Sequence, residues 1–514
     1  MATADVRSTG RAMTVLMRFL QLIERAGNKL PHPFWLFILM GVLVVLLSAL
    51  LEALDAYAVS PADGERIAVK SLISPEGVQV VFGDAVDNFA SFPPMALIMV
   101  VMLGVAVAER AGLLNAVLRG SVTRVPDKLL TLALALVGVS ASVASDAAYV
   151  VLVPLGAMIF KAAGRSPILG LVTAFGSISA GYNASIALTP GDALFAGLTT
   201  GAAQIIDPQY TVTPVANYFF TAVSAVLLAL IITAVAEFVL APATARMQVD
   251  GDGADAELGD MRLTADERRG LRNALLVVVA VAALVAAALI PSGSPFRGED
   301  GGVLSSPLIT GIAFIMGLLF LVAGAVFGRT TGSLSRAREI PEAMAQGVRD
   351  LAPVLVLFFA AAQFLAYFKW TGLGEVLAVR GAELLDAAGV PTPVMLVGMV
   401  LVCTVMNIMI TSGSAQWALV APVFVPMFML LSIPPETTQA VFRVADSPTN
   451  VISPMSPYFA MALGFLQRYR RDAGIGTLLS MTLPISVAML VGWTLILLVW
   501  WGLGIPLGPG AAVR

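Results

Sequence analysis

Cysteine, histidine and charged residues are scarce in this chain of 514 residues. The single cysteine, Cys403, excludes an intramolecular disulfide and a cluster of thiolate ligands. The single histidine, His32, argues against a zinc site and against histidine-based catalysis. No GxxxxGK[ST] phosphate loop occurs, so ATP-driven transport within the chain is not expected. Charged residues make up 12% of the chain, about half the share found in soluble domains.

Apolar residues are in excess instead, at 58% of the chain, and the mean hydropathy is +0.90. They form blocks of ~20 residues or more, the length that a helix needs to cross the hydrocarbon core. The ~10-residue alternating segments of a β-barrel do not occur. The first block follows a basic, amphipathic N-terminus (1–33) and is too long for the apolar part of a signal peptide. The composition therefore predicts an all-α polytopic membrane protein.

Hydropathy predicts nine spanning helices and two interrupted apolar blocks. The two blocks, 129–160 and 396–433, are broken midway by "SASVASDAAY" and "ITSGSAQW". A polar centre suits a re-entrant hairpin, whose tip is buried in protein, better than a lipid-exposed span. The predicted spans are 34–54, 94–112, 168–190, 214–241, 273–291, 306–327, 351–368, 436–465 and 476–504.

The distribution of Lys and Arg predicts the orientation of these segments. With a cytoplasmic N-terminus, 22 of the 30 Lys and Arg residues fall in inside segments and six in outside segments. This asymmetry follows the positive-inside rule and places the C-terminus outside. It also makes 242–272 a cytoplasmic linker between two halves, 34–241 and 273–514.

The two halves repeat one pattern. A shift of 268 residues places "SDAAYVVLVPL" (145–155) on "GSAQWALVAPV" (413–423), and it places Tyr149 on Trp417. The same shift places "TAFGSISAGYNASIA" on residues 441–455, so each hairpin is followed by a polar, broken helix, at 168–190 and 436–465. One hairpin opens inward and the other outward in this topology. The repeats are therefore predicted to be inverted, as in many secondary transporters.

Two hairpin tips and two broken helices meeting at mid-membrane predict a binding site. Backbone groups freed at membrane depth need partners, which a polar substrate or an ion supplies. Helix N-termini attract anions, whereas unwound carbonyls and carboxylates attract Na⁺. We therefore predict a secondary transporter coupled to Na⁺ or H⁺, with no cofactor, no enzymatic activity and no nucleic-acid partner, surrounded by membrane lipid.

Arg443 and Asp446 are the main candidates for this site. They lie three residues apart, so they share a helix face, and ionisable residues inside a membrane are candidates for function by default. Arg443 is predicted to bind a substrate carboxylate through its planar fork, and Asp446 to hold a cation or proton. A structural ion pair between the two is the alternative. Trp417 is a candidate for stacking on an aromatic substrate ring, with packing as its alternative role.

Other polar residues mark the tips and breaks. Asp146 at the first tip, and Asn183 and Asn450 in the breaks, are candidate Na⁺ ligands together with Asp446. Capping a hairpin helix is the alternative for Asp146, and satisfying freed backbone groups is the alternative for the two asparagines. Asp192 follows "LTPG", a pattern typical of a turn or helix cap.

Four stretches resemble the AbgT family of p-aminobenzoyl-glutamate transporters. They are "LPHPFWLF", "SDAAYVVLVPL", "SAQWALVAPVFVPM" and, as the most specific, "RVADSPTNVISPMSPYF". The resemblance extends over nearly the whole chain. It implies nine spans with two hairpins, membership among inverted-repeat ion-coupled carboxylate carriers, a bacterial inner-membrane location and a homodimer.

The resemblance also implies a cargo and several contacts to it. Members take up p-aminobenzoyl-glutamate, a folate breakdown product, and some export sulfonamide antimetabolites. The functional positions of the family match Asp192, Ser414, Trp417, Arg443, Asp446 and Pro454, with Asn407 and Pro435 nearby. The first broken helix reads "AGYNASIAL" where the family pattern is closer to "GGFSANLLL", so the resemblance implies no role for Asn183.

Two other functions compete with this prediction. A Na⁺-coupled dicarboxylate carrier of the same architecture would make little use of Trp417. An intramembrane aspartyl enzyme would require Asp146 and Asp446 to converge. A channel is less favoured, because inverted repeats with hairpins usually support alternating access.

Overall fold

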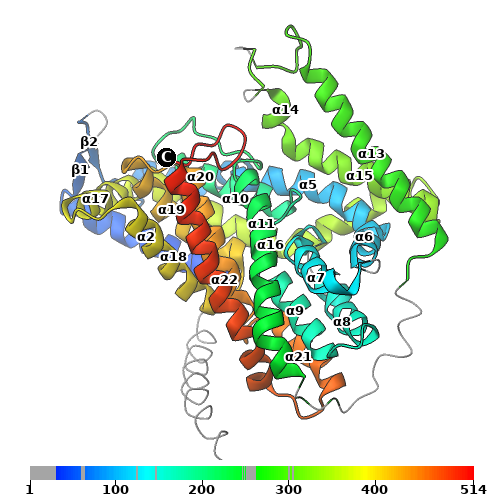
Figure 1. The fold of residues 1–514 in the computed structure, drawn as a ribbon. Coiled ribbons are helices and arrows are strands. Elements are labelled where there is room, and N and C mark those ends of the chain that lie inside the picture. The colour runs from blue at the N-terminus through cyan, green and yellow to red at the C-terminus, as the bar shows by residue number, and fades with distance from the viewer. Residues whose placement is uncertain are drawn as a thin grey trace, which may run out of the picture.

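The computed structural model describes residues 31–59, 64–122, 125–144, 147–245, 247, 249, 262–298, 301–303 and 306–514. Over these residues the chain is almost entirely helical, as predicted (Figure 1). The one sheet in the described part of the chain is a pair of short antiparallel strands, β1 (Tyr57–Val59) and β2 (Arg66–Ala68). Most of the predicted N-terminal segment 1–33 and much of the linker 242–272 lie outside the described residues.

Nine helices of the described part are long and apolar enough to cross a membrane. Their number equals the prediction, but their membership differs. Both arms of the second hairpin qualify, whereas the two broken helices do not, because each is divided into shorter pieces. The nine are α2 (Pro33–Ala53), α5 (Pro93–Arg110), α11 continued through η4 and α12 (Tyr218–Thr244), α13 (Ala265–Leu289), α15 (Ile312–Thr331), α16 (Glu339–Trp370), α18 (Thr392–Met409), α19 (Gly413–Leu430) and α22 (Ile475–Leu503).

Both predicted hairpins are helix–turn–helix units close to the expected bounds. The first comprises α7 (Leu130–Val139), the 3₁₀ turn η3 (Ala141–Ala144) and α8 (Ala147–Ala162). The second comprises α18 and α19, joined at residues 410–412. In both units the second arm carries a proline inside the helix at the same repeat position, Pro154 in α8 and Pro422 in α19.

The broken helices each consist of two helical pieces around a non-helical gap. The first is α9 (Pro167–Ala180) and α10 (Pro190–Ala203), separated by residues 181–189. The second is α20 (Pro435–Asn450) and α21 (Pro457–Tyr469), separated by residues 451–456. Pro454 lies in this second gap, whereas Pro448 lies inside α20.

The predicted end of the first broken helix at residue 190 is wrong, because α10 continues to Ala203. Hydropathy missed α10 because it is built from small residues that pack tightly against α5. A Cβ on Gly197 would lie 2.4 Å from the Cα of Pro94, so glycine permits the two backbones to approach. The helix is buried through close packing and not through bulky apolar side chains.

The broken helices run in opposite directions along α11. Just before α9, Arg165 pairs with Glu237 near the C-terminal end of this span, with Nη2 to Oε1 at 2.8 Å. At the start of α20, the carbonyl of Glu436 accepts a hydrogen bond from the amide of Asn217 at 2.9 Å, and Asn217 precedes α11 directly. This is the opposite orientation that inverted repeats require.

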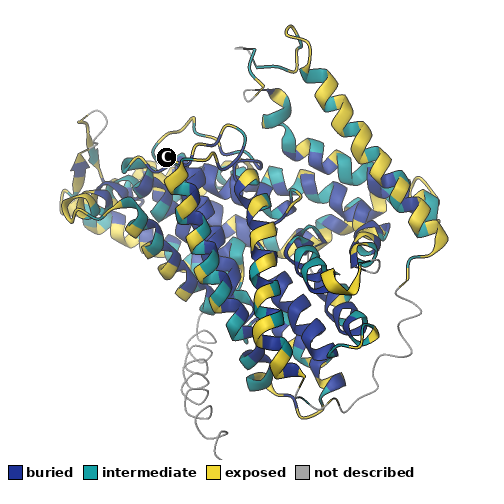
Figure 2. Ribbon diagram, viewed as in Figure 1, coloured by how far each residue is buried: buried dark blue, intermediate teal, exposed yellow. Residues whose placement is uncertain are grey.

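The first piece of each broken helix, α9 or α20, lies in the buried centre of the molecule. Every residue of α9 is buried, and so is every residue of α20 except the last. The exposed residues gather on outer helices such as α13, in which only Gly270 and Ala274 are buried (Figure 2). The remaining short elements connect the spans. They are α3 (Pro75–Val78), η1 (Gln79–Gly83), α4 (Ala85–Ala90), α6 (Leu113–Val122), η2 (Asp127–Leu129), α14 (Pro307–Thr310) and α17 (Leu373–Ala387).

Candidate functional site

Both hairpin tips and both helix breaks line one cavity of about 490 Å³. A volume of this size lies within the ~300–1,000 Å³ typical of small-molecule sites. The second tip contributes residues 411–414, and the first hairpin contributes Ser142 and Tyr149. The breaks and the helix ends beside them contribute further residues: Tyr182 and Asn183 from the first break, Pro190 and Gly191 from the start of α10, Asn450 from the end of α20, Ser456 from the second break, and Pro457 and Tyr458 from the start of α21. Asp446 also lines this cavity. The structure therefore brings together the segments that the repeat pattern singled out.

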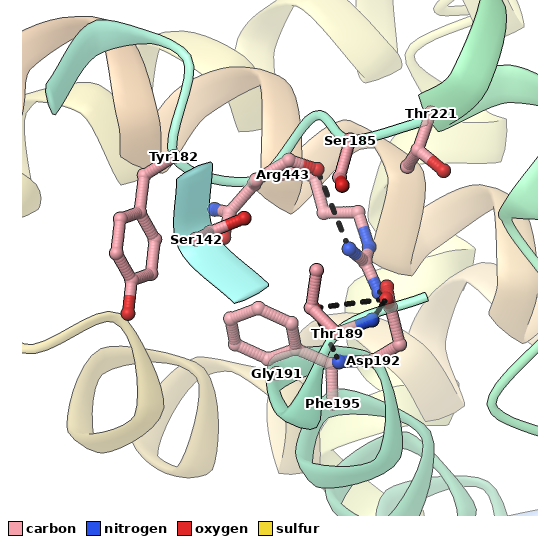
Figure 3. A pocket seen from close by; sticks show the side chains of 10 residues that line it. Ser142, Tyr182, Ser185, Thr189, Gly191, Asp192, Phe195, Thr221 and Arg443 are labelled. Atoms are coloured by element: carbon pink, nitrogen blue, oxygen red, sulfur yellow. Dashed lines mark hydrogen bonds and ion pairs between the residues drawn. The ribbon is translucent and has the colours of Figure 1, made fainter. Parts of the chain in front are cut away.

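A smaller pocket of about 20 Å³ adjoins this cavity and contains Arg443 and Asp192 (Figure 3). The two spaces share several wall residues, namely Ser142, Tyr182, Asn183, Gly191 and Phe195. A ligand that fills the larger cavity would therefore have its edge close to the guanidinium group.

Arg443 pairs with Asp192 of the other half, and not with Asp446 of its own helix. Its Nη2 lies 2.7 Å from Oδ1 of Asp192, and the two side chains are 3% and 8% exposed. The guanidinium carbon lies 5.1 Å from the centre of the Phe195 ring, within the range of a cation–π contact. Nη1 donates to the backbone carbonyl of Asn183 at 3.4 Å. Nε has no hydrogen-bond partner among the described residues.

Asp192 both caps α10 and pairs with Arg443. Its Oδ2 accepts hydrogen bonds from the backbone N–H of Thr189 at 2.7 Å and from the Thr189 hydroxyl at 2.9 Å. The backbone N–H of Asp192 donates in return to Thr189 Oγ1 at 3.3 Å, and this bond and the first one together form a capping box at the start of α10, which stabilises the helix end that the break exposes. The other oxygen, Oδ1, remains for Arg443 (Figure 3).

Asp446 is held by Asn183 of the first break and faces the first turn of α19. The amide of Asn183 donates to Oδ2 of Asp446 at 2.7 Å. A Cβ on Gly413 would lie 3.0 Å from each carboxylate oxygen, so the carboxylate lies directly against the N-terminal end of α19. Such an end favours negative charge. Oδ1 of Asp446 is buried and has no hydrogen-bond partner among the described residues.

Asn407 joins the second hairpin to the end of α20. Its amide donates to the backbone carbonyl of Asp446, to Thr449 Oγ1 at 2.8 Å and to Asn450 Oδ1 at 3.0 Å. The carbonyl oxygen of the same side chain is buried without a described donor. Two buried oxygens, from Asp446 and Asn407, thus remain available, and oxygen ligands suit hard cations. In the described part of the chain, no three His, Cys, Asp or Glu side chains lie close enough together to hold a metal ion.

The other predicted site residues occupy different positions. Ser414 lines the large cavity. Trp417 is fully buried, stacks on Phe442 with ring centres 4.6 Å apart, and donates from its indole N–H to Thr199 Oγ1 at 3.0 Å. Trp417, Pro435 and Pro454 line neither the cavity nor the small pocket. Asp146 lies outside the described residues.

Sequence reasoning missed the aromatic residues of the cavity. Tyr149, Tyr182, Phe195 and Tyr458 all line it, and the rings of Tyr149 and Tyr458 are stacked at 4.0 Å. One signal was present for Tyr149, because the 268-residue shift places it on Trp417. No comparable signal marked Tyr458, whose position depends on where the second break ends.

The N-terminal end of α20 is held by a tyrosine from the loop after α10. Tyr210 donates to Oε2 of Glu436 at 3.0 Å. Burial, followed by the adjacent Glu436 carboxylate, raises the pKa of Tyr210 above its ordinary value. The phenol therefore stays protonated and continues to donate. This contact ties the start of the helix that carries Arg443 and Asp446 to the first half.

The chain is similar to transport proteins over almost its full length. Residues 18–514 match the family model described as the AbgT putative transporter family. The p-aminobenzoyl-glutamate transport protein of Escherichia coli (strain K12) is 36% identical over 493 residues, which cover 96% of each chain.

Two solved structures are similar as well. The YdaH transporter of Alcanivorax borkumensis, described as having an unusual topology, is 41% identical with a TM-score of 0.88, over 93% of this chain and 100% of the other. MtrF of Neisseria gonorrhoeae, described in connection with a class of antimetabolite efflux pumps, is 40% identical with a TM-score of 0.91, over 96% and 100%.

Proposed function

The chain belongs to the AbgT putative transporter family, and from this premise we propose its cargo and its mechanism. The protein carries p-aminobenzoyl-glutamate and related aromatic carboxylates across the bacterial inner membrane, and sulfonamide antimetabolites are a further cargo. Transport is secondary and is coupled to Na⁺ or H⁺. The names of the relatives support the choice of cargo.

The observation that carries this proposal is the position of Arg443 beside the cavity. Its guanidinium is almost fully buried and already binds one carboxylate, that of Asp192. A cargo carboxylate has the same geometry, and Nε is an additional donor without a described partner. Nε and Nη2 together form the planar fork that binds a carboxylate bidentately, which is a strong form of carboxylate recognition. Cargo therefore binds by sharing or replacing the contact with Asp192.

The coupling ion is proposed to bind at Asp446. Asp446 and Asn407 supply buried oxygens without described donors, and Asn450 supplies an amide oxygen beside them. These groups fit Na⁺, whereas a proton requires only the carboxylate. Binding of either ion neutralises the negative charge of the Asp446 carboxylate in the cavity wall. Because the glutamate part of the cargo is dianionic, this neutralisation favours its binding, and cargo and ion then bind cooperatively.

The arrangement of the two halves supports alternating access. The antiparallel broken helices and the two hairpins surround one cavity, which is the arrangement expected of inverted-repeat carriers. We infer that both hairpins are re-entrant, that the N-terminus is cytoplasmic and the C-terminus external, and that the protein forms a homodimer. Transport is favoured over the aspartyl enzyme because the family and the relatives are transporters.

A dicarboxylate carrier of the same architecture is the second candidate. One observation favours it, because Trp417 is packed against Phe442 and lines neither cavity. The two candidates differ in whether the aromatic ring of the cargo contributes to affinity. Competition by an aliphatic dicarboxylate as strong as that by p-aminobenzoyl-glutamate would favour the second candidate.

Flux in proteoliposomes tests the proposal directly. Labelled p-aminobenzoyl-glutamate and a labelled sulfonamide are offered under an imposed Na⁺ or H⁺ gradient. Wild type is expected to accumulate cargo under one of the two gradients, whereas Arg443→Ala and Asp446→Ala are expected to abolish flux at normal expression. Arg470→Ala serves as the control, because this arginine pairs with the exposed Asp472 outside the site. Flux like that of wild type in both site variants would contradict the assignment.

A further inference from the structure

We propose that Tyr149 and Tyr458 form the surface on which the aromatic ring of the cargo packs. This inference rests on the proposed function. It names the residues of the same site that contact the aromatic ring of the cargo. It differs from the sequence-based expectation, which assigned that contact to Trp417. Three observations carry it: the geometry of the pair, the composition of the cavity wall and the burial of Trp417.

The two tyrosines come from different halves and meet at the cavity. Tyr149 lies in the first turn of α8, in the first hairpin, and Tyr458 lies at the start of α21, directly after the second break. Their rings are parallel within 3° and their centres are 4.0 Å apart. Both residues line the 490 Å³ cavity. Each ring covers one face of the other, and Tyr149 is buried whereas Tyr458 is partly exposed. The aromatic surface is therefore Tyr458 backed by Tyr149, and it is assembled only when the first hairpin and the second broken helix are in contact.

Neighbouring residues fix the orientation of Tyr149. The hydroxyl of Ser179 in α9 lies 3.3 Å from the Tyr149 hydroxyl. The ring also contacts Phe175 of the same helix, with centres 6.3 Å apart. Because Tyr149 is only 3% exposed, few other orientations are open to it. A preorganised ring costs little conformational entropy when a ligand binds.

The rest of the cavity wall complements a molecule with a ring and carboxylates. The second hairpin tip contributes hydroxyl groups at Thr411, Ser412 and Ser414, and Asp446 and Asn450 add polar groups. Arg443 lies in the adjoining pocket. Sites for small molecules typically combine an apolar or aromatic wall with a few placed polar groups. The tyrosine pair supplies the aromatic wall that an aminobenzoyl or sulfonamide ring requires.

Trp417 cannot supply that wall in this structure. Its side chain has no exposed surface, since Phe442 covers one face and its N–H is bound to Thr199. In the repeat register Trp417 occupies the position of Tyr149. Both residues therefore pack against a broken helix, but only Tyr149 also lines the cavity.

Affinity measurements with two ligands test the inference. The ligands are p-aminobenzoyl-glutamate and N-acetyl-glutamate, which has the same dicarboxylate without the aromatic ring, and the protein is the full chain in detergent. Tyr149→Leu and Tyr458→Leu are each expected to weaken binding of the aromatic ligand by about 5- to 10-fold. The affinity for N-acetyl-glutamate is expected to stay within about 2-fold, which also reports that the variants are folded.

Matched variants separate the contribution of the tyrosine rings to affinity from that of their hydroxyl groups and from that of Trp417. Tyr149→Phe and Tyr458→Phe retain the ring and are expected to keep the preference for the aromatic ligand. Preserved preference in both leucine variants, or its selective loss in Trp417→Leu, would overturn the ring assignment while leaving the proposed function intact. Equal loss of both ligands in the leucine variants would also overturn it. Failure of wild type to bind p-aminobenzoyl-glutamate would overturn the proposed function, and the ring site with it.

Discussion

Arg443 and Asp192 form a buried ion pair that joins the two halves of the chain at the binding site. Removing two charges from water is costly, and their attraction compensates only when the geometry is good. Replacement of one partner leaves the other charge buried without compensation, at a cost of about 3–5 kcal/mol. Because Asp192 also caps α10, the pair links the recognition of an anion to the stability of the first break.

A double-mutant cycle on this pair is expected to show strong coupling. Asp192→Asn retains an oxygen for the cap but leaves Arg443 uncompensated, so the apparent Tm in detergent should fall clearly. Adding Arg443→Met should restore part of the loss, with a coupling free energy above about 1 kcal/mol. Asp472→Asn, at a pair where the aspartate is 68% exposed, should change little. Additive effects of the two site substitutions would show that the pair does not interact.

Gly413 provides a second test at the scale of one residue. A Cβ at this position would lie 3.0 Å from both oxygens of Asp446, which is too close without movement of the carboxylate. Gly413→Ala is therefore expected to reduce the apparent affinity for the coupling ion by about 10-fold or more.

The control for Gly413 lies in the other arm of the same hairpin. A Cβ on Gly398 would meet no atom within 4 Å, so Gly398→Ala should leave ion-dependent flux within about 2-fold. Both variants are measured as flux against ion concentration in proteoliposomes. An unchanged ion dependence in Gly413→Ala would show that this carboxylate does not hold the ion.

At the scale of elements, close helix contacts position the site through small residues. Helices α5 and α15 approach each other so closely that a Cβ on Gly104 would lie 1.8 Å from the carbonyl oxygen of Gly317. Side chains of this size at an interface allow the backbones to pack, which drives helix association in a membrane. Helix α5 in turn supports α10, the piece that begins at the Asp192 cap.

Gly104→Ala is expected to destabilise the protein, because the added methyl group forces α5 and α15 apart. Overpacking of this kind costs about 1–3 kcal/mol, which should appear as a lower apparent Tm in detergent. Gly464→Ala in α21 is the matched control, since a Cβ there meets nothing within 4 Å. Helix propensity alone should make that variant neutral or slightly more stable. Equal Tm values for the two variants would contradict the close packing.

At the scale of the whole molecule, the orientation that we propose from the Lys and Arg distribution has a direct test. The single cysteine, Cys403, is buried, so it should not react with a membrane-impermeant maleimide. In a Cys403→Ser background, Ala388→Cys is expected to label from outside intact cells. Arg471→Cys is expected to label only after permeabilisation. Both positions are exposed in the structure, and the reverse pattern would invert the proposed topology.

The sequence determined the class of the protein, its repeat and the segments that build the site. Apolar blocks of membrane-spanning length follow from the cost of placing polar groups in lipid, so composition alone predicts a helical membrane protein. Polar interruptions of two apolar blocks identified both hairpins, and the 268-residue shift identified the broken helix that follows each of them. These features are local, because a polar tip or an interrupted helix is visible in a single stretch of residues. Arg443 and Asp446 were identified for the same reason.

Only the tertiary structure decided which of these residues meet. The pairing of Arg443 with Asp192, and not with Asp446, spans the two halves of the chain. The extent of α10 also escaped the sequence, because its burial comes from backbone contact at Gly197 and not from hydropathy. Likewise, Tyr149 and Trp417 share a repeat position, yet one lines the cavity and the other is covered by Phe442. Contacts between distant segments depend on packing in three dimensions, which no local pattern encodes.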